Sequence, residues 1–178
     1  MFRMLKTNVF WLAALLGAAA ATINNVGAGA EANVQPAIDL IARNFGPKAA
    51  SAISLTLTEG GCKNTNGESV AAPCFAIEQS EGKVHVTASS MSELTYGIGH
   101  YARYTCGLTV GRDKWGGSHT TSKAWPCTDS FKPVVVSRAV PYIFQDNVCT
   151  HSYSYVWYGE KEWTEHIDEM ALKGINIF

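Results

Sequence analysis

The sequence has few charged residues and almost no net charge, which argues against several classes of function. Charged side chains make up 16% of the 178 residues, and the formal net charge is −1. No block of lysine and arginine occurs, so the chain offers little to attract nucleic acid or an anionic membrane surface. With 47% hydrophobic residues, the composition is that of a globular protein.

Motifs for metal ions and activated nucleophiles are lacking as well. The histidines are scattered, and neither Cys-x-x-Cys nor His-Glu-x-x-His spacing occurs, so the sequence predicts no zinc site. A Gly-x-Ser-x-Gly elbow and a phosphate-binding loop are also missing. The common serine-hydrolase and nucleotide-binding interpretations are therefore excluded.

No apolar run is long enough to cross a membrane, but a shorter run stands at the N-terminus. Arg3 and Lys6 precede Val9–Ala21, and small residues follow. This pattern indicates a secretory signal peptide, because a membrane-spanning helix needs about 20 apolar residues. We expect residues 1–31 to be a signal peptide and leader that direct the protein into the secretory pathway.

Five cysteines form an odd set for an oxidising compartment. The pairing we prefer is Cys62–Cys74 and Cys106–Cys127, although four cysteines permit three connectivities. Cys149 is then left over, at the polar end of an apolar run. On the residues alone, such a cysteine either fills core space or presents a thiol to a ligand.

Between residues 32 and 111 the patterns predict helix, strand, hairpin and helix. A helix is expected over 35–47, an alternating strand over 53–58, and two hairpin strands over 74–79 and 83–88. The second helix is expected over 90–105. Together these elements form a small α/β domain.

The second helix carries specific local signals. Ser90 and Glu93 form a capping box, in which each side chain accepts the other residue's backbone N–H. Gly97 and Gly99 lower helix propensity, which indicates close packing against the sheet. The apolar face expected on this helix consists of Leu94, Ile98, Tyr101 and Ala102.

A loop over 108–133 and an extended linker over 133–141 follow this domain. Trp115 and Trp125 lie in the loop. Their rings either stack on a sugar or pin the loop to the core, and pinning is the more common role.

The last third of the chain predicts a βαβ unit. An apolar strand over 142–148 is followed by a polar loop, a helix over 160–173 and a strand over 175–178. Gly174 ends the helix, and the two strands should be parallel. The residues expected on the buried helix face are Trp163, Ile167, Met170 and Ala171.

This segment resembles the opening of the catalytic barrel in the α-N-acetylglucosaminidases, glycoside hydrolase family 89. The resemblance is carried by 147–157 (NVCTHSYSYVW), Trp163, 167–168 and 170–176, and a weaker likeness covers 90–107. It implies an α/β fold in which a small N-terminal domain precedes the start of a TIM (β/α)8 barrel.

The resemblance also implies a division of the chain into two parts. Residues 32–133 would form the N-terminal domain with its trailing loop. Residues 134–178 would supply the first strand, the helix and the start of the second strand of the barrel. We expect 32–133 to fold alone, and 134–178 to be mobile or prone to aggregate because its strand edges lack partners.

The resemblance further implies that Asn147, Cys149 and Tyr153 line a pocket for a terminal N-acetylglucosamine. On composition alone, a strand-end cap would suit Asn147 and a core aromatic would suit Tyr153. Ser152, Ser154, Tyr155 and Trp157 match the motif as supporting residues, and His151 has no assigned role.

The activity implied for the full-length protein is retaining hydrolysis of terminal α-linked N-acetylglucosamine from glycans such as heparan sulfate. Two glutamates perform this reaction in the family, on later barrel strands, so we expect no catalytic residue here and no activity from this piece alone. No cofactor or metal is implied. We expect a glycan partner, no nucleic acid, no membrane after signal cleavage, a lysosomal or extracellular location, and any oligomer to form through the full-length protein.

Two other functions compete with this one. The first is a non-catalytic or degenerate secreted module that binds carbohydrate through Tyr153, Tyr155, Trp157 and Trp125. The second is a disulfide-stabilised extracellular domain without a ligand.

Overall fold

The computed structural model describes residues 33–111, 117–120, 125–146, 153 and 155–178. The predicted signal peptide and Trp115 lie outside this described part. No helix within it is both long and apolar enough to span a membrane.

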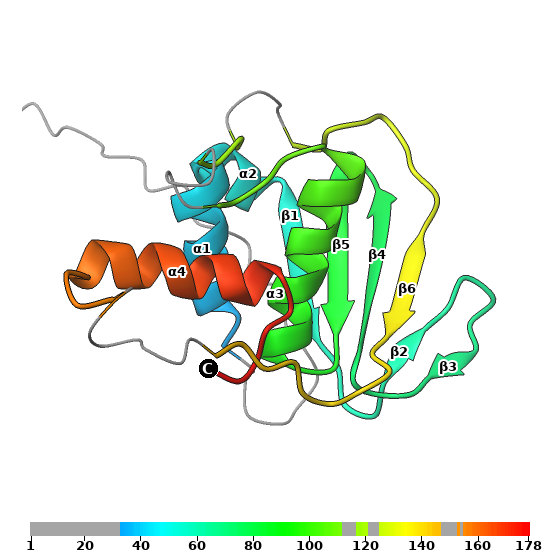
Figure 1. Cartoon of the computed structure of the whole chain (residues 1–178). Helices are drawn as coiled ribbons and strands as arrows, with labels where there is room; N and C mark the ends of the chain where they lie inside the picture. The colour runs from blue at the N-terminus through cyan, green and yellow to red at the C-terminus, as the bar shows by residue number, and fades with distance from the viewer. Residues whose placement is uncertain (1–32, 112–116, 121–124, 147–152, 154) are drawn as a thin grey trace, which may run out of the picture.

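A four-stranded mixed sheet forms one side of the described part of the chain (Figure 1), with the strand order β1-β5-β4-β6. β4 and β5 form the predicted antiparallel hairpin, while β1 is parallel to β5. A second, two-stranded sheet, β2 with β3, lies inside the predicted loop after β1. The strands are β1 (Ile53–Leu57), β2 (Cys62–Lys63), β3 (Ser69–Val70), β4 (Cys74–Ser80), β5 (Lys83–Ala88) and β6 (Val134–Ser137).

Helices cover one face of this sheet, and the core lies between them and the strands (Figure 1). The helices are α1 (Gln35–Phe45), α2 (Pro47–Ser51), α3 (Met91–His100) and α4 (Glu160–Leu172). A π-helical turn, Tyr101–Thr105, extends α3. The apolar face predicted for this helix is confirmed, because all four of its residues are buried.

The two glycines of α3 permit two different close approaches. A methyl group on Gly97 would lie 2.8 Å from Val86 Cγ1 and 3.2 Å from the Phe75 ring, so this glycine packs against the sheet as predicted. A methyl group on Gly99 would collide with the backbone carbonyl of Leu172 in α4. The prediction is therefore wrong for Gly99, because the close neighbour at this glycine is helix α4 and not a strand of the sheet.

Both predicted disulfides are confirmed. Cys62–Cys74 joins β2 to β4, and Cys106–Cys127 joins the end of the π-helical turn to the following loop. The loop is also held by Trp125, which is buried against Phe45 and Tyr101 with ring centroids 5.0 and 5.1 Å apart. Trp125 therefore pins the loop to the core, as predicted.

The capping box at the start of α3 is only half formed. Ser90 Oγ accepts the Glu93 backbone N–H at 3.3 Å. The Glu93 carboxylate, however, lies 2.6 Å from Nη2 of Arg138, and both side chains are buried. The prediction that Glu93 reaches back to Ser90 is wrong, because its carboxylate is paired with the Arg138 guanidinium instead.

The linker predicted over 133–141 contains a strand of the sheet. β6 pairs antiparallel with β4, and Arg138 N donates to Pro73 O at 2.8 Å. Residues 134–137 therefore belong to the same sheet as the N-terminal strands. The division of the chain at residues 133 and 134 stays a prediction, and this sheet crosses it.

The two strands predicted for the βαβ unit are reduced in the described residues to one isolated bridge, which is parallel as expected. Phe144 bridges Ile177, Gln145 N donates to Ile177 O at 3.1 Å, and Ile177 N donates to Ile143 O at 3.2 Å. The expectation of a buried strand is wrong for Tyr142 and Phe144, whose exposed fractions are 67% and 62%.

The buried face predicted for α4 is partly right: Met170 is buried and Trp163 and Ala171 are half-buried, but the prediction is wrong for Ile167. Ile167 is 54% exposed, whereas Asp168 is buried. The Asp168 carboxylate accepts hydrogen bonds from Arg43 Nε and Nη2 at 3.0 and 2.8 Å and from Asn44 Nδ2 at 2.7 Å, both on α1. These polar contacts fix the rotation of α4.

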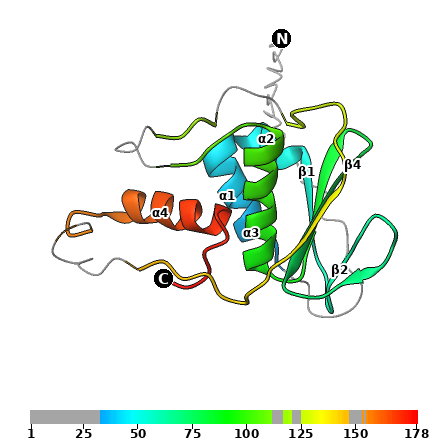
Figure 2. The same cartoon turned by 45° about the vertical axis from the view of Figure 1, so that its right-hand side comes forward.

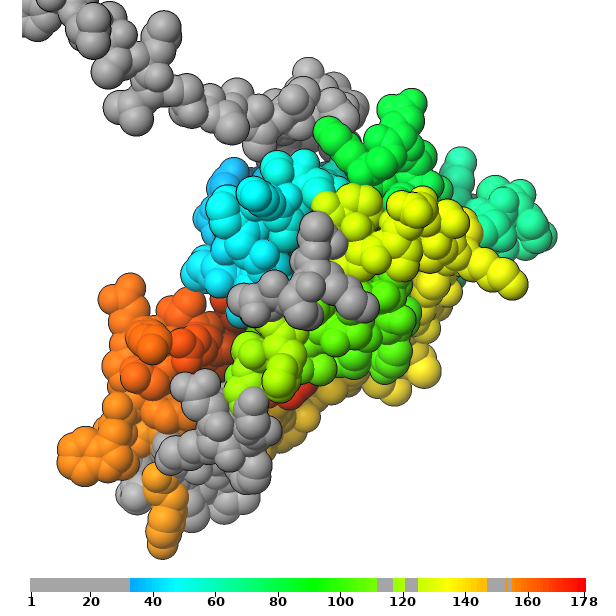
Figure 3. All heavy atoms as spheres, turned by 90° about the horizontal axis from the view of Figure 1, so that it is seen from above, coloured from blue at the N-terminus to red at the C-terminus, as the bar shows by residue number. Residues whose placement is uncertain are grey.

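Through these contacts α4 finds partners in the N-terminal part of the chain. Its C-terminal end packs against α3, and Figure 2 shows it crossing that helix on the side away from the sheet. Seen from above, α4 and the segment before it extend to one side of the body formed by the other elements (Figure 3). Our expectation that 134–178 lacks partners does not hold for β6 and α4.

Substituting Gly99 tests the approach of α4 to α3. Gly99→Ala should lower the free energy of unfolding by about 1–3 kcal/mol, because a backbone carbonyl cannot turn aside as a side chain can. This loss should exceed the gain of about 1 kcal/mol in helix propensity. The measurement is urea denaturation, with Gly111→Ala as the control, since its methyl would lie 3.4 Å from the nearest atom. An unchanged midpoint for Gly99→Ala would contradict this packing.

Substituting Glu93 tests the buried ion pair. Glu93→Gln should cost about 3–5 kcal/mol, because it leaves the Arg138 charge buried without its partner. The exposed pair Lys161–Glu165, at 3.7 Å, supplies the control. Glu165→Gln should change stability by no more than about 1 kcal/mol in the same denaturation experiment. Equal effects from the two variants would count against a buried pair.

Alkylation tests the cysteine assignment. With four cysteines in the two disulfides, the oxidised mature chain should react with iodoacetamide once, at Cys149. Mass spectrometry after alkylation without reductant should show one adduct, and after reduction five. Zero or three adducts in the first measurement would refute the assignment.

Candidate functional site

The predicted sugar-contacting loop begins where the parallel strand around Phe144 ends. Because the segments around Phe144 and Ile177 run parallel, their carboxyl ends lie at the same edge of the unit. Asn147 and Cys149 lie outside the described residues, as do His151, Ser152 and Ser154. The roles assigned to Asn147 and Cys149 stay predictions.

Tyr153 is the one predicted contact residue that the structure describes. Its side chain is 75% exposed, so it is not packed into the core of the described part of the chain. An exposed tyrosine offers a ring face for stacking on a pyranose and a hydroxyl for hydrogen bonding. The structure therefore leaves the ring accessible, and its role in binding stays a prediction.

An aromatic cluster anchors the segment that follows the loop. Tyr155 is buried, and its hydroxyl lies 2.9 Å from Nε2 of the buried His166 on α4. The Phe178 ring, at the end of the second strand, lies 5.4 Å from the His166 ring. The rings in contact are Tyr155, Tyr158, Trp163, His166 and Phe178. The cluster thus ties the end of the loop to both helix and strand.

Trp157 behaves differently from its neighbour Tyr155. Both were predicted to support the loop from behind. Tyr155 is packed in the cluster, whereas the Trp157 side chain is 90% exposed.

Three carboxylates of α4 have structural partners. Glu162 Oε2 accepts the Gly159 backbone N–H at 3.0 Å and so caps the helix. Hydrogen bonds from its own backbone N–H and from that of Gly159 lower the pKa of Glu162, so this cap stays ionised to a lower pH than a free glutamate would. Glu169 pairs with Lys173 at 2.5 Å, and Asp168 pairs with Arg43. These groups hold the helix in place, as expected for the outer side of a barrel.

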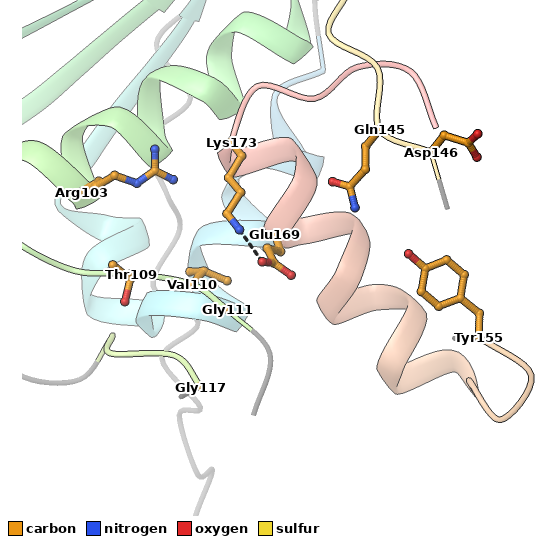
Figure 4. Close-up of a pocket in the computed structure, with 10 residues that line it drawn as sticks. All are labelled: Arg103, Thr109, Val110, Gly111, Gly117, Gln145, Asp146, Tyr155, Glu169 and Lys173. Atoms are coloured by element: carbon orange, nitrogen blue, oxygen red, sulfur yellow. Dashed lines mark hydrogen bonds and ion pairs between the residues drawn. The ribbon is translucent and has the colours of Figure 1, made fainter. Parts of the chain in front are cut away.

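An open cavity of about 570 Å³ lies between the π-helical turn and α4 (Figure 4). Its lining residues are Arg103, Thr109, Val110, Gly111, Gly117, Gln145, Asp146, Tyr155, Glu169 and Lys173. Of its two carboxylates, that of Glu169 is paired with Lys173, while that of Asp146 points away from the ion pair (Figure 4). The described lining therefore lacks the two facing carboxylates that glycoside hydrolysis requires.

Metal binding has no structural support in the described part of the chain. No three histidine, cysteine, aspartate or glutamate side chains gather there to hold an ion. For an organic ligand, the segment after Phe144 offers the exposed rings of Tyr153 and Trp157.

Comparison with known proteins decides the family. Residues 35–127, more than half of the chain, match the model of the α-N-acetylglucosaminidase (NAGLU) N-terminal domain. The chain belongs to the α-N-acetylglucosaminidase family. Residues 143–178 match the TIM-barrel domain of the same family. Both parts of the resemblance found in the sequence are confirmed.

Relatives of known name and structure agree with this assignment. Human α-N-acetylglucosaminidase is 36% identical over 98 residues, which cover 53% of this chain and 12% of the human protein. The family 89 glycoside hydrolase of Clostridium perfringens shares the fold with a TM-score of 0.66 at 20% identity, over 80% of this chain and 15% of that one. The predicted fold class is therefore confirmed, and the chain spans less than a sixth of each relative.

Sequence reasoning missed the polar contacts that hold this region together. Asp168 belongs to the motif that carried the resemblance, but nothing in its spacing pointed to Arg43, 125 residues away. The bond between Tyr155 and His166 was also missed. A signal for it existed, since a histidine next to the apolar stripe of a helix needs a hydrogen-bond partner once buried.

Proposed function

We propose that this chain is part of an exo-α-N-acetylglucosaminidase that removes terminal α-linked N-acetylglucosamine from glycans such as heparan sulfate. The observation that carries the proposal is the order of the two family matches, N-terminal domain and then TIM-barrel domain, in one chain. Further support comes from the Clostridium perfringens enzyme, which has been solved in complex with its substrate GlcNAc-α-1,4-galactose in a form carrying two Glu-to-Gln substitutions.

In this proposal the chain binds sugar and leaves bond cleavage to residues outside it. Asn147, Cys149 and Tyr153 contact the terminal N-acetylglucosamine, with the exposed Tyr153 ring available for stacking. The catalytic pair consists of two glutamates on later barrel strands, acting with retention of configuration. Three acidic residues of α4, Glu162, Asp168 and Glu169, are engaged in capping and ion pairs and are not available for this role.

The exposed apolar side chains of the C-terminal unit support a barrel context. Tyr142, Phe144, Ile167 and Phe178 are each more than half exposed. In a closed (β/α)8 barrel such strand and helix residues are covered by neighbouring strands and helices. The remaining strands of the proposed enzyme would cover them here.

The N-terminal sequence supports a location along the secretory pathway, in the lysosome or outside the cell. Arg3 and Lys6, followed by the apolar run Val9–Ala21, are typical of a signal peptide. The two disulfides suit the same oxidising compartments.

The competing proposal is a secreted carbohydrate-binding module without catalysis. The exposed rings of Tyr153 and Trp157 favour it, since a binding platform needs accessible aromatic faces. Tyr155 and Trp125, which belonged to the same hypothesis, are both buried and cannot form such a platform.

Hydrolysis assays separate these proposals. The product of the complete open reading frame should hydrolyse 4-nitrophenyl α-N-acetylglucosaminide, with the β-linked anomer as the control substrate. The first sugar released should be the α-anomer by NMR, because retention requires it. The 178-residue chain alone should release no 4-nitrophenol.

Two results would contradict the proposed enzyme. One is hydrolysis by the 178-residue chain unaided, which would place the catalytic groups within it. The other is a complete product that fails to cleave the α-linked substrate but binds N-acetylglucosamine-terminated glycans, which would favour the binding module.

A further inference from the structure

Arg138 is a buried cation that the proposed reaction does not use directly. It directly follows β6, and its backbone N–H donates to Pro73 O at 2.8 Å, which fixes its main chain to the N-terminal sheet. Its side chain is only 3% exposed. Such burial of a guanidinium requires compensating contacts, because removing the charge from water costs several kcal/mol.

Those contacts come from two separate parts of the chain. On α3, the Glu93 carboxylate lies 2.6 Å from Nη2, and the Tyr96 ring centroid lies 5.2 Å from the guanidinium carbon. On the other side, Nη1 donates to the carbonyl oxygen of Gly174 at 2.6 Å. One guanidinium thus connects α3 to the turn between α4 and the strand that follows.

The geometry at Gly174 leaves this turn little freedom. Gly174 has φ +78°, and a methyl group there would lie 2.8 Å from the Tyr96 ring. Two residues later the strand begins its pairing, with Asn176 N donating to Ile143 O at 3.1 Å. A shift of the Gly174 carbonyl would therefore also move the paired segments around Phe144 and Ile177.

Stability alone does not account for this arrangement. Within the described residues, Nε and Nη2 of Arg138 are buried and have no hydrogen-bond partner. The 2.6 Å contact between Nη2 and Glu93 is therefore an ion pair whose geometry is not that of a hydrogen bond. Apolar side chains of similar volume in place of both Arg138 and Glu93 would fill the same space without burying unsatisfied donors or an unpaired charge. Such side chains would not hold the Gly174 carbonyl.

We propose that Arg138 is a positioning residue: by holding the Gly174 carbonyl against α3, it sets the strand ends that carry the sugar-contacting loop. This inference rests on the proposed glycosidase function. Arg138 touches neither the sugar nor the reacting atoms. It acts through Gly174 on the paired segments around Phe144 and Ile177, after the first of which the predicted sugar-contacting loop begins.

The test compares Arg138→Lys and Arg43→Gln in the product of the complete open reading frame. Arg138→Lys keeps the positive charge beside Glu93 but replaces the planar fork by one ammonium, which cannot contact Glu93 and Gly174 with the same geometry. Arg43→Gln is the matched control. It removes the ion pair to Asp168 on α4, keeps the Asn44 hydrogen bond to the same carboxylate, and does not touch the Arg138 bond to the Gly174 carbonyl.

Kinetics with 4-nitrophenyl α-N-acetylglucosaminide, well below the thermal midpoints, give the readout. For Arg138→Lys we expect kcat/KM to fall by about tenfold or more, because small misplacements of binding groups have effects of this size. The loss should lie mainly in KM, since the displaced residues bind the sugar while the catalytic glutamates lie elsewhere. Arg43→Gln should keep kcat/KM within about twofold, whatever its thermal midpoint, because it leaves the strand ends in place.

The alternative outcomes each reject the inference. It fails if Arg138→Lys leaves kcat/KM unchanged, if the loss is confined to kcat, or if Arg43→Gln reduces kcat/KM as much. A wild-type product inactive on the α-linked substrate would instead reject the proposed function, so the two failures are distinguishable.

Discussion

The buried guanidinium of Arg138 is the interaction on which the arrangement of the whole chain depends. It is held by the sheet through its backbone and by Glu93 and Tyr96 through its side chain, and it binds the carbonyl at the end of α4. Because an unpaired buried charge is costly, the groups around it cannot separate independently. The sheet, α3 and the C-terminal strand pair are therefore coupled at one point.

Two other contacts at the same junction determine how α4 is oriented. Asp168 fixes the rotation of α4 by accepting hydrogen bonds from Arg43 and Asn44, so that Ile167 is turned to solvent. Gly99 permits the backbone of α4 to come closer than any other residue would allow. Directed polar contacts and one close backbone approach together allow a single orientation of α4 against α1 and α3, whereas a purely apolar interface tolerates several orientations.

Through this junction, the N-terminal domain of this member of the α-N-acetylglucosaminidase family has a structural role, which is to hold the segment that follows it. The domain contains no catalytic group that we can identify among the described residues, yet it is the template against which the first helix and strands of the barrel are placed. In the proposed enzyme, sugar binding would depend on the ends of those strands. The domain would thus influence binding through position rather than through contact.

Local patterns were sufficient for most individual elements. The alternation in 83–88 predicted β5 with the bounds found, and the 3.6-residue period predicted the buried face of α3. Both disulfides were correctly paired, although spacing alone left three connectivities open. In the candidate site, Tyr153 was found exposed, while Asn147 and Cys149 rested on the family resemblance throughout.

What the sequence by itself determined is what depends on near neighbours: helix and strand periods, the hairpin, the glycine that ends α4, and the motif that identifies the family. What only the tertiary structure decided is where the elements meet. The pairing of β6 with β4, the turn of Ile167 to solvent and the partner of Glu93 all depend on residues tens of positions away. A periodic pattern records that a side chain is apolar or charged, but the partner of a buried charge is set by the fold.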